Sequence, residues 1–157
     1  ILIMGVSGAG KTTIGTELSA KIGGKFVDAD ALHPIRNIEK MKNGLALTDQ
    51  DREEWLCKFA KLIRNYNDTN TLVIACSALK ETYRKRLGRD NYKLVYLKGS
   101  QILVEKRLAS RKNHFMPVSL LNSQFGDLEE PLDALEISVS KSPVEIISTI
   151  MYELSLC

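Results

Sequence analysis

The feature that most constrains the fold of this chain is a glycine-rich string near its start. Residues 5–12 read GVSGAGKT, which fits the pattern GxxxxGK[ST] at every fixed position. An apolar run, residues 1–4, precedes the string, and a helical stretch predicted over 11–22 follows it and stops at Gly23-Gly24. A strand that passes through such a loop into a helix opens a parallel α/β sheet, so the sequence predicts that fold class.

The same string predicts a site for the phosphates of ATP or GTP. Glycines allow backbone N–H groups to converge on an anion, and the helix that follows adds its positive N-terminal end. The Lys11 ammonium can reach the β- and γ-phosphates, and the Thr12 hydroxyl can bind Mg²⁺. The predicted nucleotide contacts are Gly5, Val6, Ser7, Gly8, Ala9, Gly10, Lys11, Thr12 and Thr13, with Thr12 as the metal ligand.

The rest of the chain alternates short apolar runs with helical periodicities, as expected of a P-loop fold of three α/β/α layers. Helical spacing places Leu56, Phe59, Ala60 and Ile63 on one buried stripe, and Ile147, Ile150, Met151 and Leu154 on another; Trp55 is expected to pack in the core. The length of 157 residues fits one domain, 1–157. Five parallel strands are predicted, over 1–4, 26–28, 72–76, 92–97 and 135–139.

Composition excludes several classes of partner. The 22 basic and 19 acidic residues leave a net charge of +3, which suits a small anionic ligand better than nucleic acid or a membrane surface. No apolar run approaches the roughly 20 residues of a membrane span. The three cysteines have no CxxC spacing, which favours a reduced, cytoplasmic protein.

Missing motifs narrow the kind of nucleotide-binding protein. The strings DxxG and NKxD, typical of GTPase switches, do not occur. The strand at 72–76 runs into Cys76-Ser77 without the acidic residue that motor ATPases carry there. The Mg²⁺ shell is therefore expected to be completed by water and Asp28 or Asp30.

Asp28 and Asp30 stand two residues apart at the end of the second predicted strand, so their side chains are expected on one face near the carboxyl edge of the sheet. A carboxylate there can orient a substrate hydroxyl toward the γ-phosphate and accept its proton. We predict this role for Asp30, while the alternative that Asp28 is a turn aspartate capping the helix that begins near His33-Pro34 stays open.

Five separated strings make the sequence resemble the gluconate kinase family over most of its length. They are GVSGAGKT at 5–12, DADALHPIRNIEKMKNGLALTDQDREEWL at 28–56, ACSALKETYR at 75–84, LKGS at 97–100 and RKNHFMPVSLLNSQF at 111–125. Shikimate and adenylate kinases share only the loop and the general plan. The resemblance implies phosphorylation of D-gluconate by Mg·ATP to 6-phospho-D-gluconate, and a homodimer.

The resemblance also implies which residues contact the sugar acid. His33, Arg36 and Asn37 would lie close to Asp30, and Arg52 is a further candidate ligand for an anion; a packing role for His33 and solvated charges for the arginines stay open. Ser77 could take the place of the missing acidic residue by binding a water molecule of the Mg²⁺ shell. The implied substrate set is Asp30, His33, Arg36, Arg52, Ser77, Lys80, Arg84, His114 and Gln124, with Gln124 equally compatible with a surface amide.

A mobile lid is implied over about 107–124. Arg111 would neutralise charge in the transition state once the lid closes, which makes it a catalytic residue with Lys11 and Asp30. Arg107 more resembles a residue that stacks on adenine. Two alternatives stay open: the same fold acting on another small hydroxy acid such as shikimate, or on a nucleotide, and a non-catalytic ATP-binding regulator.

Overall fold

One parallel sheet of five strands organises the molecule. The computed structural model describes residues 1–67, 69–110 and 120–156. The strand order is β2-β3-β1-β4-β5, and every neighbouring pair is parallel. The strands are β1 (Leu2–Met4), β2 (Lys25–Asp28), β3 (Leu72–Ala75), β4 (Leu94–Lys98) and β5 (Leu135–Ser138). All five predicted strands are present, so the predicted sheet is confirmed.

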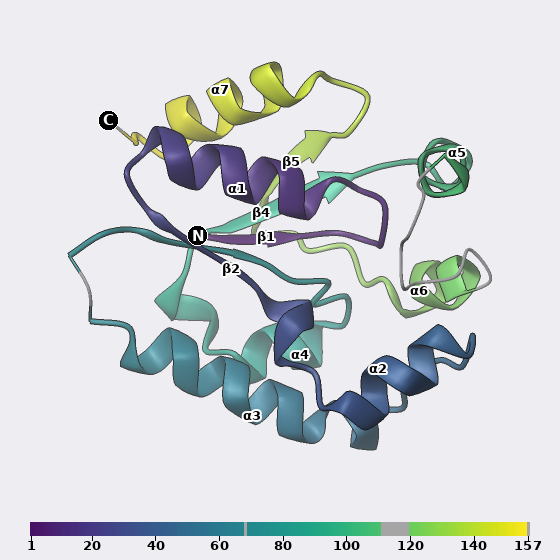
Figure 1. Ribbon diagram of the computed structural model, residues 1–157. Helices are drawn as coiled ribbons and strands as arrows, with labels where there is room; N and C mark the ends of the chain where they lie inside the picture. The colour runs from purple at the N-terminus through teal and green to yellow at the C-terminus, as the bar shows by residue number, and fades with distance from the viewer. Residues whose placement is uncertain (68, 111–119, 157) are drawn as a thin grey trace.

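Helices cover both faces of the sheet. Figure 1 shows α1 and α7 on one face and α3 and α4 on the other, while α5 and α6 lie beyond the carboxyl ends of the strands. The three predicted layers are confirmed. The helices are α1 (Lys11–Lys21), α2 (Ile35–Lys42), α3 (Asp49–Asn65), α4 (Glu81–Arg86), α5 (Gln101–Ala109), α6 (Leu121–Asp127) and α7 (Pro143–Glu153), with short 3₁₀ turns η1 (Ala29–Leu32) and η2 (Arg89–Asn91).

The central strand β1 contributes to two hydrophobic cores. Its three residues are fully buried, and successive side chains point to opposite faces. Ile3 packs with α1 and α7, whereas Leu2 and Met4 pack with α3. Each predicted apolar stripe belongs to one of these cores, and Trp55 is buried as expected.

A capping box fixes the start of α3. The Thr48 hydroxyl accepts a hydrogen bond from the Asp51 backbone N–H at 3.2 Å, and the Asp51 carboxylate accepts one from the Thr48 backbone N–H at 2.7 Å. Such a box satisfies N–H groups that the first helical turn leaves without partners. The first turn of α3, which carries Asp49 and Arg52, is therefore held in a defined position.

The two cysteines in the described residues differ in exposure. Cys57 is exposed and Cys76 buried, and neither forms a disulfide. Burial, together with the charge of Asp30, raises the pKa of the Cys76 thiol, which keeps this thiol neutral. Within the described ranges, each helix is too short or too polar to cross a bilayer.

Candidate active site

Glycine is required at several positions of the loop between β1 and α1. Gly5, Gly8 and Gly10 have φ values of 148°, 85° and 97°, which side-chain-bearing residues rarely adopt. A Cβ at Gly5 would lie 2.8 Å from the Leu97 carbonyl oxygen. The loop thus combines positive φ angles with close backbone approach, as the predicted phosphate site requires.

Lys11 and Thr12 begin α1 directly behind this loop. The Lys11 side chain is largely buried, and its Nζ donates a hydrogen bond to the Val6 carbonyl at 3.0 Å, so the ammonium lies over the loop. The Thr12 hydroxyl donates to Asp28 Oδ2 at 2.9 Å. This bond brings the start of α1 to the carboxyl end of β2.

Asp28 and Asp30 differ in their surroundings. Asp28 also accepts a hydrogen bond from the Asp30 backbone N–H at 3.0 Å and so caps η1. The predicted alternative, a cap on the helix near His33-Pro34, differs, because the N-cap of α2 is Pro34 and no side chain caps it. Burial raises the pKa of Asp30; the Lys11 ammonium opposes this and the Asp28 charge adds to it. A carboxylate with a raised pKa beside the phosphate lysine suits the proton acceptor of a transfer reaction.

The oxygen atoms beside the loop fit Mg²⁺. The Thr12 hydroxyl and the Asp28 carboxylate are the hard oxygen donors that this ion prefers, and Mg²⁺ commonly keeps several waters and binds substrate phosphates rather than a protein cage. Among the residues described, no group of three or more His, Cys, Asp or Glu side chains could hold a metal. A site shared with phosphate and water is the kind that these residues can provide.

A pocket opens between Asp30, α3 and α6. Five of the predicted site residues line it: Asp30, His33, Arg52, Ser77 and Gln124. Trp55 and Tyr83 also line it, and Asp127 closes one side. The fold thus gathers side chains from η1, the segment after η1, α3, the end of β3 and α6 around one hollow next to the phosphate loop.

His33 is held in a neutral state at this pocket. Its ring stacks on Trp55 with centroids 4.6 Å apart and planes 9° from parallel, and its Nδ1 lies 3.4 Å from Asn37 Nδ2. Burial and the nearby Arg52 charge lower the pKa of His33 to about 4. A neutral imidazole offers one donor and one acceptor, which suits a hydroxyl-rich ligand.

Two cations lie against Tyr83: Arg52, which lines the pocket, and Lys80, which lies beside the lining residues Tyr83 and Asp127. Arg52 donates to the Tyr83 hydroxyl at 3.0 Å, and the hydroxyl in turn donates to Asp49. Lys80 Nζ lies 2.8 Å from Asp49 Oδ1. The Arg52 guanidinium and the Lys80 ammonium lie 5.4 and 5.6 Å from the centre of the Tyr83 ring, within cation–π range.

Comparisons with known proteins agree with this geometry. The family model for shikimate kinase matches residues 7–140. A gluconokinase from Arabidopsis thaliana is 43% identical over 96% of this chain and 89% of its own length. The crystal structure of a gluconokinase from Sinorhizobium meliloti 1021 superposes with a TM-score of 0.85 at 36% identity, over 98% of this chain and 90% of that chain.

The chain belongs to the gluconokinase family. A shikimate kinase from Aquifex aeolicus has a TM-score of 0.62 and 15% identity over 98% of this chain and 94% of its own, which shows a shared fold alone. The match to the shikimate kinase model therefore agrees with the shared plan, and the higher identities select the gluconokinase family.

Two predicted substrate residues of this gluconokinase-family protein lie elsewhere. The Arg36 guanidinium donates to Glu54 at 2.8 Å, and its side chain is 67% exposed, which agrees with the solvated alternative. The Arg84 guanidinium is buried and donates to the backbone carbonyls of Ala78, Leu79 and Glu129. Arg84 therefore holds the segment after β3 in place and is not itself among the residues that line the pocket.

Gln124 connects the pocket to the phosphate loop. Its Oε1 accepts a hydrogen bond from the Ser7 backbone N–H at 2.6 Å, across 117 residues of sequence. Gln124 is consequently part of a link between α6 and the loop. This contact differs from the alternative prediction, in which Gln124 is only a surface amide.

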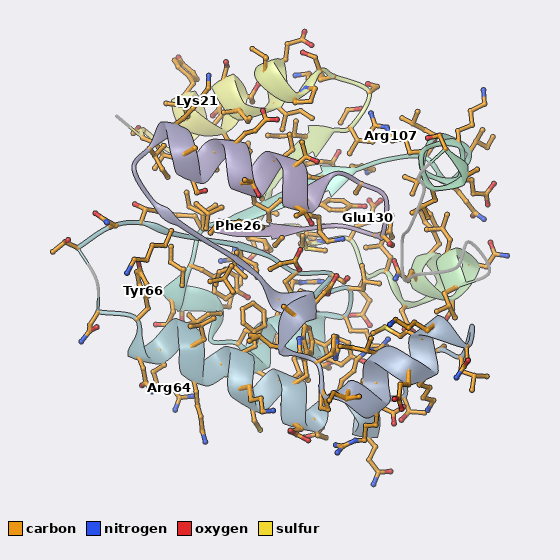
Figure 2. The ribbon with its side chains drawn as sticks, in the orientation of Figure 1. Lys21, Phe26, Arg64, Tyr66, Arg107 and Glu130 are labelled. Carbon is orange, nitrogen blue, oxygen red and sulfur yellow. The ribbon has the colours of Figure 1, made fainter. Side chains whose placement is uncertain are left out.

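Arg107 does not line this pocket and instead lies beside Gly8, Ala9 and Gly10 of the phosphate loop. Figure 2 shows it where α5 faces the connection from β5 to α7, and its guanidinium donates to the Val139 carbonyl at 2.6 Å. It lines a hollow with Gly10, Thr13 and Lys141, a position suited to an adenine base. Arg111 and His114, and much of the predicted lid, lie outside the described residues.

Tyr83 and Asp127 were missed as site residues. Tyr83 falls within the string at 75–84, which indicated the family but gave the tyrosine no role. Asp127 follows the last quoted string by two residues. Tyr83 and Asp127 both contact Arg52, which belongs to another helix, α3. No local sequence pattern encodes such contacts between elements.

Proposed function

We propose that the protein is a gluconokinase, which transfers the γ-phosphoryl group of Mg·ATP to the terminal hydroxyl of D-gluconate and forms 6-phospho-D-gluconate and ADP. One observation carries the proposal. The phosphate loop lies directly beside a pocket that holds a carboxylate, Asp30, at its near side and a cation, Arg52, at its wall, with a second cation, Lys80, next to the lining residues Tyr83 and Asp127. The gluconokinases to which the chain is similar support the choice of substrate.

At the phosphate side, Lys11 and the loop N–H groups bind the β- and γ-phosphates and hold the γ-phosphorus toward the pocket. Thr12, with Asp28 behind it, would hold Mg²⁺, which neutralises phosphate charge when bound. Arg107 would contact the adenine. Arg111 would neutralise transition-state charge, and His114 would contact the substrate.

At the reacting atoms, Asp30 accepts a hydrogen bond from the terminal hydroxyl of gluconate and orients its oxygen in line with the γ-phosphorus. The new O–P bond forms as the bond between the γ-phosphorus and the bridging oxygen of ADP breaks. The hydroxyl proton passes to Asp30, whose raised pKa suits it to hold this proton before releasing it to solvent.

At the far side of the pocket, Arg52 and Lys80 bind the carboxylate of gluconate. Their position on the Tyr83 ring keeps both cations directed at one region. His33, Ser77 and Gln124 would contact the hydroxyl groups between the two ends of the substrate. Arg36 and Arg84 are left out of this set because their guanidinium groups are engaged elsewhere.

The proposal extends to ATP and Mg²⁺ as the required partners, and to a cytoplasmic homodimer with no nucleic-acid or membrane partner. Free thiols at Cys57 and Cys76 suit a reducing compartment. The homodimer is proposed from the resemblance to the gluconate kinase family.

Turnover across a panel of acceptors tests the proposal. ADP formation with Mg·ATP would be followed with gluconate, shikimate, glycerate, AMP and no acceptor. We expect gluconate to give by far the highest kcat/KM. Preference for shikimate, which the match to the shikimate kinase model makes the second candidate, would keep phosphoryl transfer and refute the substrate. ATP binding without acceptor-dependent turnover would favour a regulator.

A further inference from the structure

Asp127, the last residue of α6, faces both cations of the pocket. Its Oδ2 lies 3.6 Å from an Nη atom of Arg52, and its Oδ1 lies 3.7 Å from the Lys80 ammonium. The carboxylate thus spans the two cations, one oxygen toward each. Its side chain is 28% exposed and lines the pocket, so it lies where a ligand would meet the same cations.

Asp49 contacts the same cations in a different way. It accepts a hydrogen bond from Lys80 at 2.8 Å and another from the Tyr83 hydroxyl. Asp127 lies beyond the 2.7–3.2 Å range of N–H···O hydrogen bonds from both cations. Asp49 is therefore a fixed structural partner, whereas Asp127 is held mainly by charge and is the easier of the two to displace.

Charge balance favours that displacement. Arg52 and Lys80 carry two positive charges, and Asp49 and Asp127 carry two negative charges, so this cluster is neutral without substrate. A carboxylate that entered the cluster would add an uncompensated negative charge in a partly buried place. The cost falls if the incoming carboxylate replaces that of Asp127.

We propose that Asp127 is an internal competitor for the carboxylate subsite: it occupies Arg52 and Lys80 in the empty enzyme, and the carboxylate of the substrate replaces it on binding. The inference rests on the proposed function, because it takes gluconate as the ligand. Asp127 thereby sets the affinity for an acidic substrate. It has no such effect on an uncharged polyol, which does not compete for the cations.

The Asp127→Asn variant tests this inference, since it removes the charge and keeps the shape. We expect the KM for gluconate to fall about threefold to tenfold, which corresponds to about 0.7–1.4 kcal/mol. Titration of gluconate without nucleotide should show the same gain in Kd. The affinity for sorbitol, which has the same carbon chain without the carboxylate, should not increase. An unchanged or raised KM and Kd for gluconate would overturn the inference.

Two further variants sharpen the result. Asp49→Asn removes the same charge but also loosens the contacts that hold Lys80 and Tyr83, so its gain in affinity for gluconate should be smaller than that of Asp127→Asn. Asp90→Asn removes an exposed carboxylate at the opposite edge of the sheet and controls for net charge. A wild-type enzyme without gluconate-dependent turnover would refute the proposed function itself; an active wild type with no gain in Asp127→Asn would refute only the competitor role.

Discussion

The phosphate end of the site, Lys11 and Thr12 with the preceding loop, and the carboxylate end, Arg52 and Lys80 with Tyr83, are built in different ways. The phosphate end comes from one continuous string, and its conformation is dictated by glycines with positive φ. The carboxylate end gathers side chains from α3, the segment after β3 and α4, and ion pairs hold them together. A local string can encode the first kind of site, whereas the second exists only after the chain has folded.

One helix joins the two ends. At one position α6 accepts a hydrogen bond from the loop through Gln124, and one turn later it presents Asp127 to the two cations. The helix α6 therefore contacts both ends of the site.

The largest effect is expected at the phosphate end. Lys11→Ala should lower kcat by about 10²–10³-fold, because it removes a charge directed at the transferring group. Steady-state turnover measures the loss, and thermal unfolding shows whether the fold is retained. Turnover close to that of the wild type would rule out the loop as the phosphate site.

Asp30→Asn separates acceptor chemistry from nucleotide binding. We expect kcat to fall by about 10²-fold, since the variant cannot accept the hydroxyl proton. The Kd for ATP should stay within a few-fold of the wild-type value, as measured by titration. Equal losses of turnover and ATP affinity would instead place Asp30 in the metal or nucleotide site.

At the carboxylate end, Arg52→Gln and Arg36→Gln form a matched pair on neighbouring helices. Arg52→Gln should raise the KM for gluconate about tenfold or more, because a partly buried charge that faces the ligand is lost. Arg36→Gln should change it little, since an exposed ion pair contributes only about 0–1 kcal/mol. The reverse ranking would move the carboxylate subsite to α2.

A smaller effect concerns pH and the His33 stack. The pKa of His33 is about 4 in the folded protein and 6.5 in its ordinary state. As the pH falls from 6.5 to 4, the unfolded chain takes up a proton that the folded chain does not, so stability falls. His33→Gln should lose less stability over this window, as measured by Tm. Parallel Tm profiles of the two proteins would show that His33 is not held neutral.

The sequence was sufficient for the sheet and for the phosphate end. Buried runs such as Leu72–Ala75 alternate with amphipathic stretches, and this periodicity defines an α/β fold. The loop glycines signal their own backbone conformation, because few other residues adopt it. Asp30 could be placed as well, since the carboxyl end of a parallel strand is where ligands bind.

The carboxylate end was only partly predictable. Arg36, Arg52 and Arg84 all lie within strings that indicated the family. Their neighbours in the sequence do not show which of the three guanidinium groups faces the pocket. Arg84 is buried where its guanidinium donates to the carbonyls of Ala78, Leu79 and Glu129, whereas Arg36 donates to Glu54 of α3. Which arginine faces the pocket depends on packing between elements, and this information appears only in three dimensions.

In the proposed reaction, gluconate spans the site, with its carboxylate at Arg52 and Lys80 and its terminal hydroxyl at Asp30. The most direct test is to incubate the enzyme with Mg·ATP and D-gluconate and to locate the phosphate in the product by NMR. We expect a single product, phosphorylated on the terminal hydroxyl. Phosphate at another hydroxyl, or no phosphorylated gluconate, would contradict this expectation.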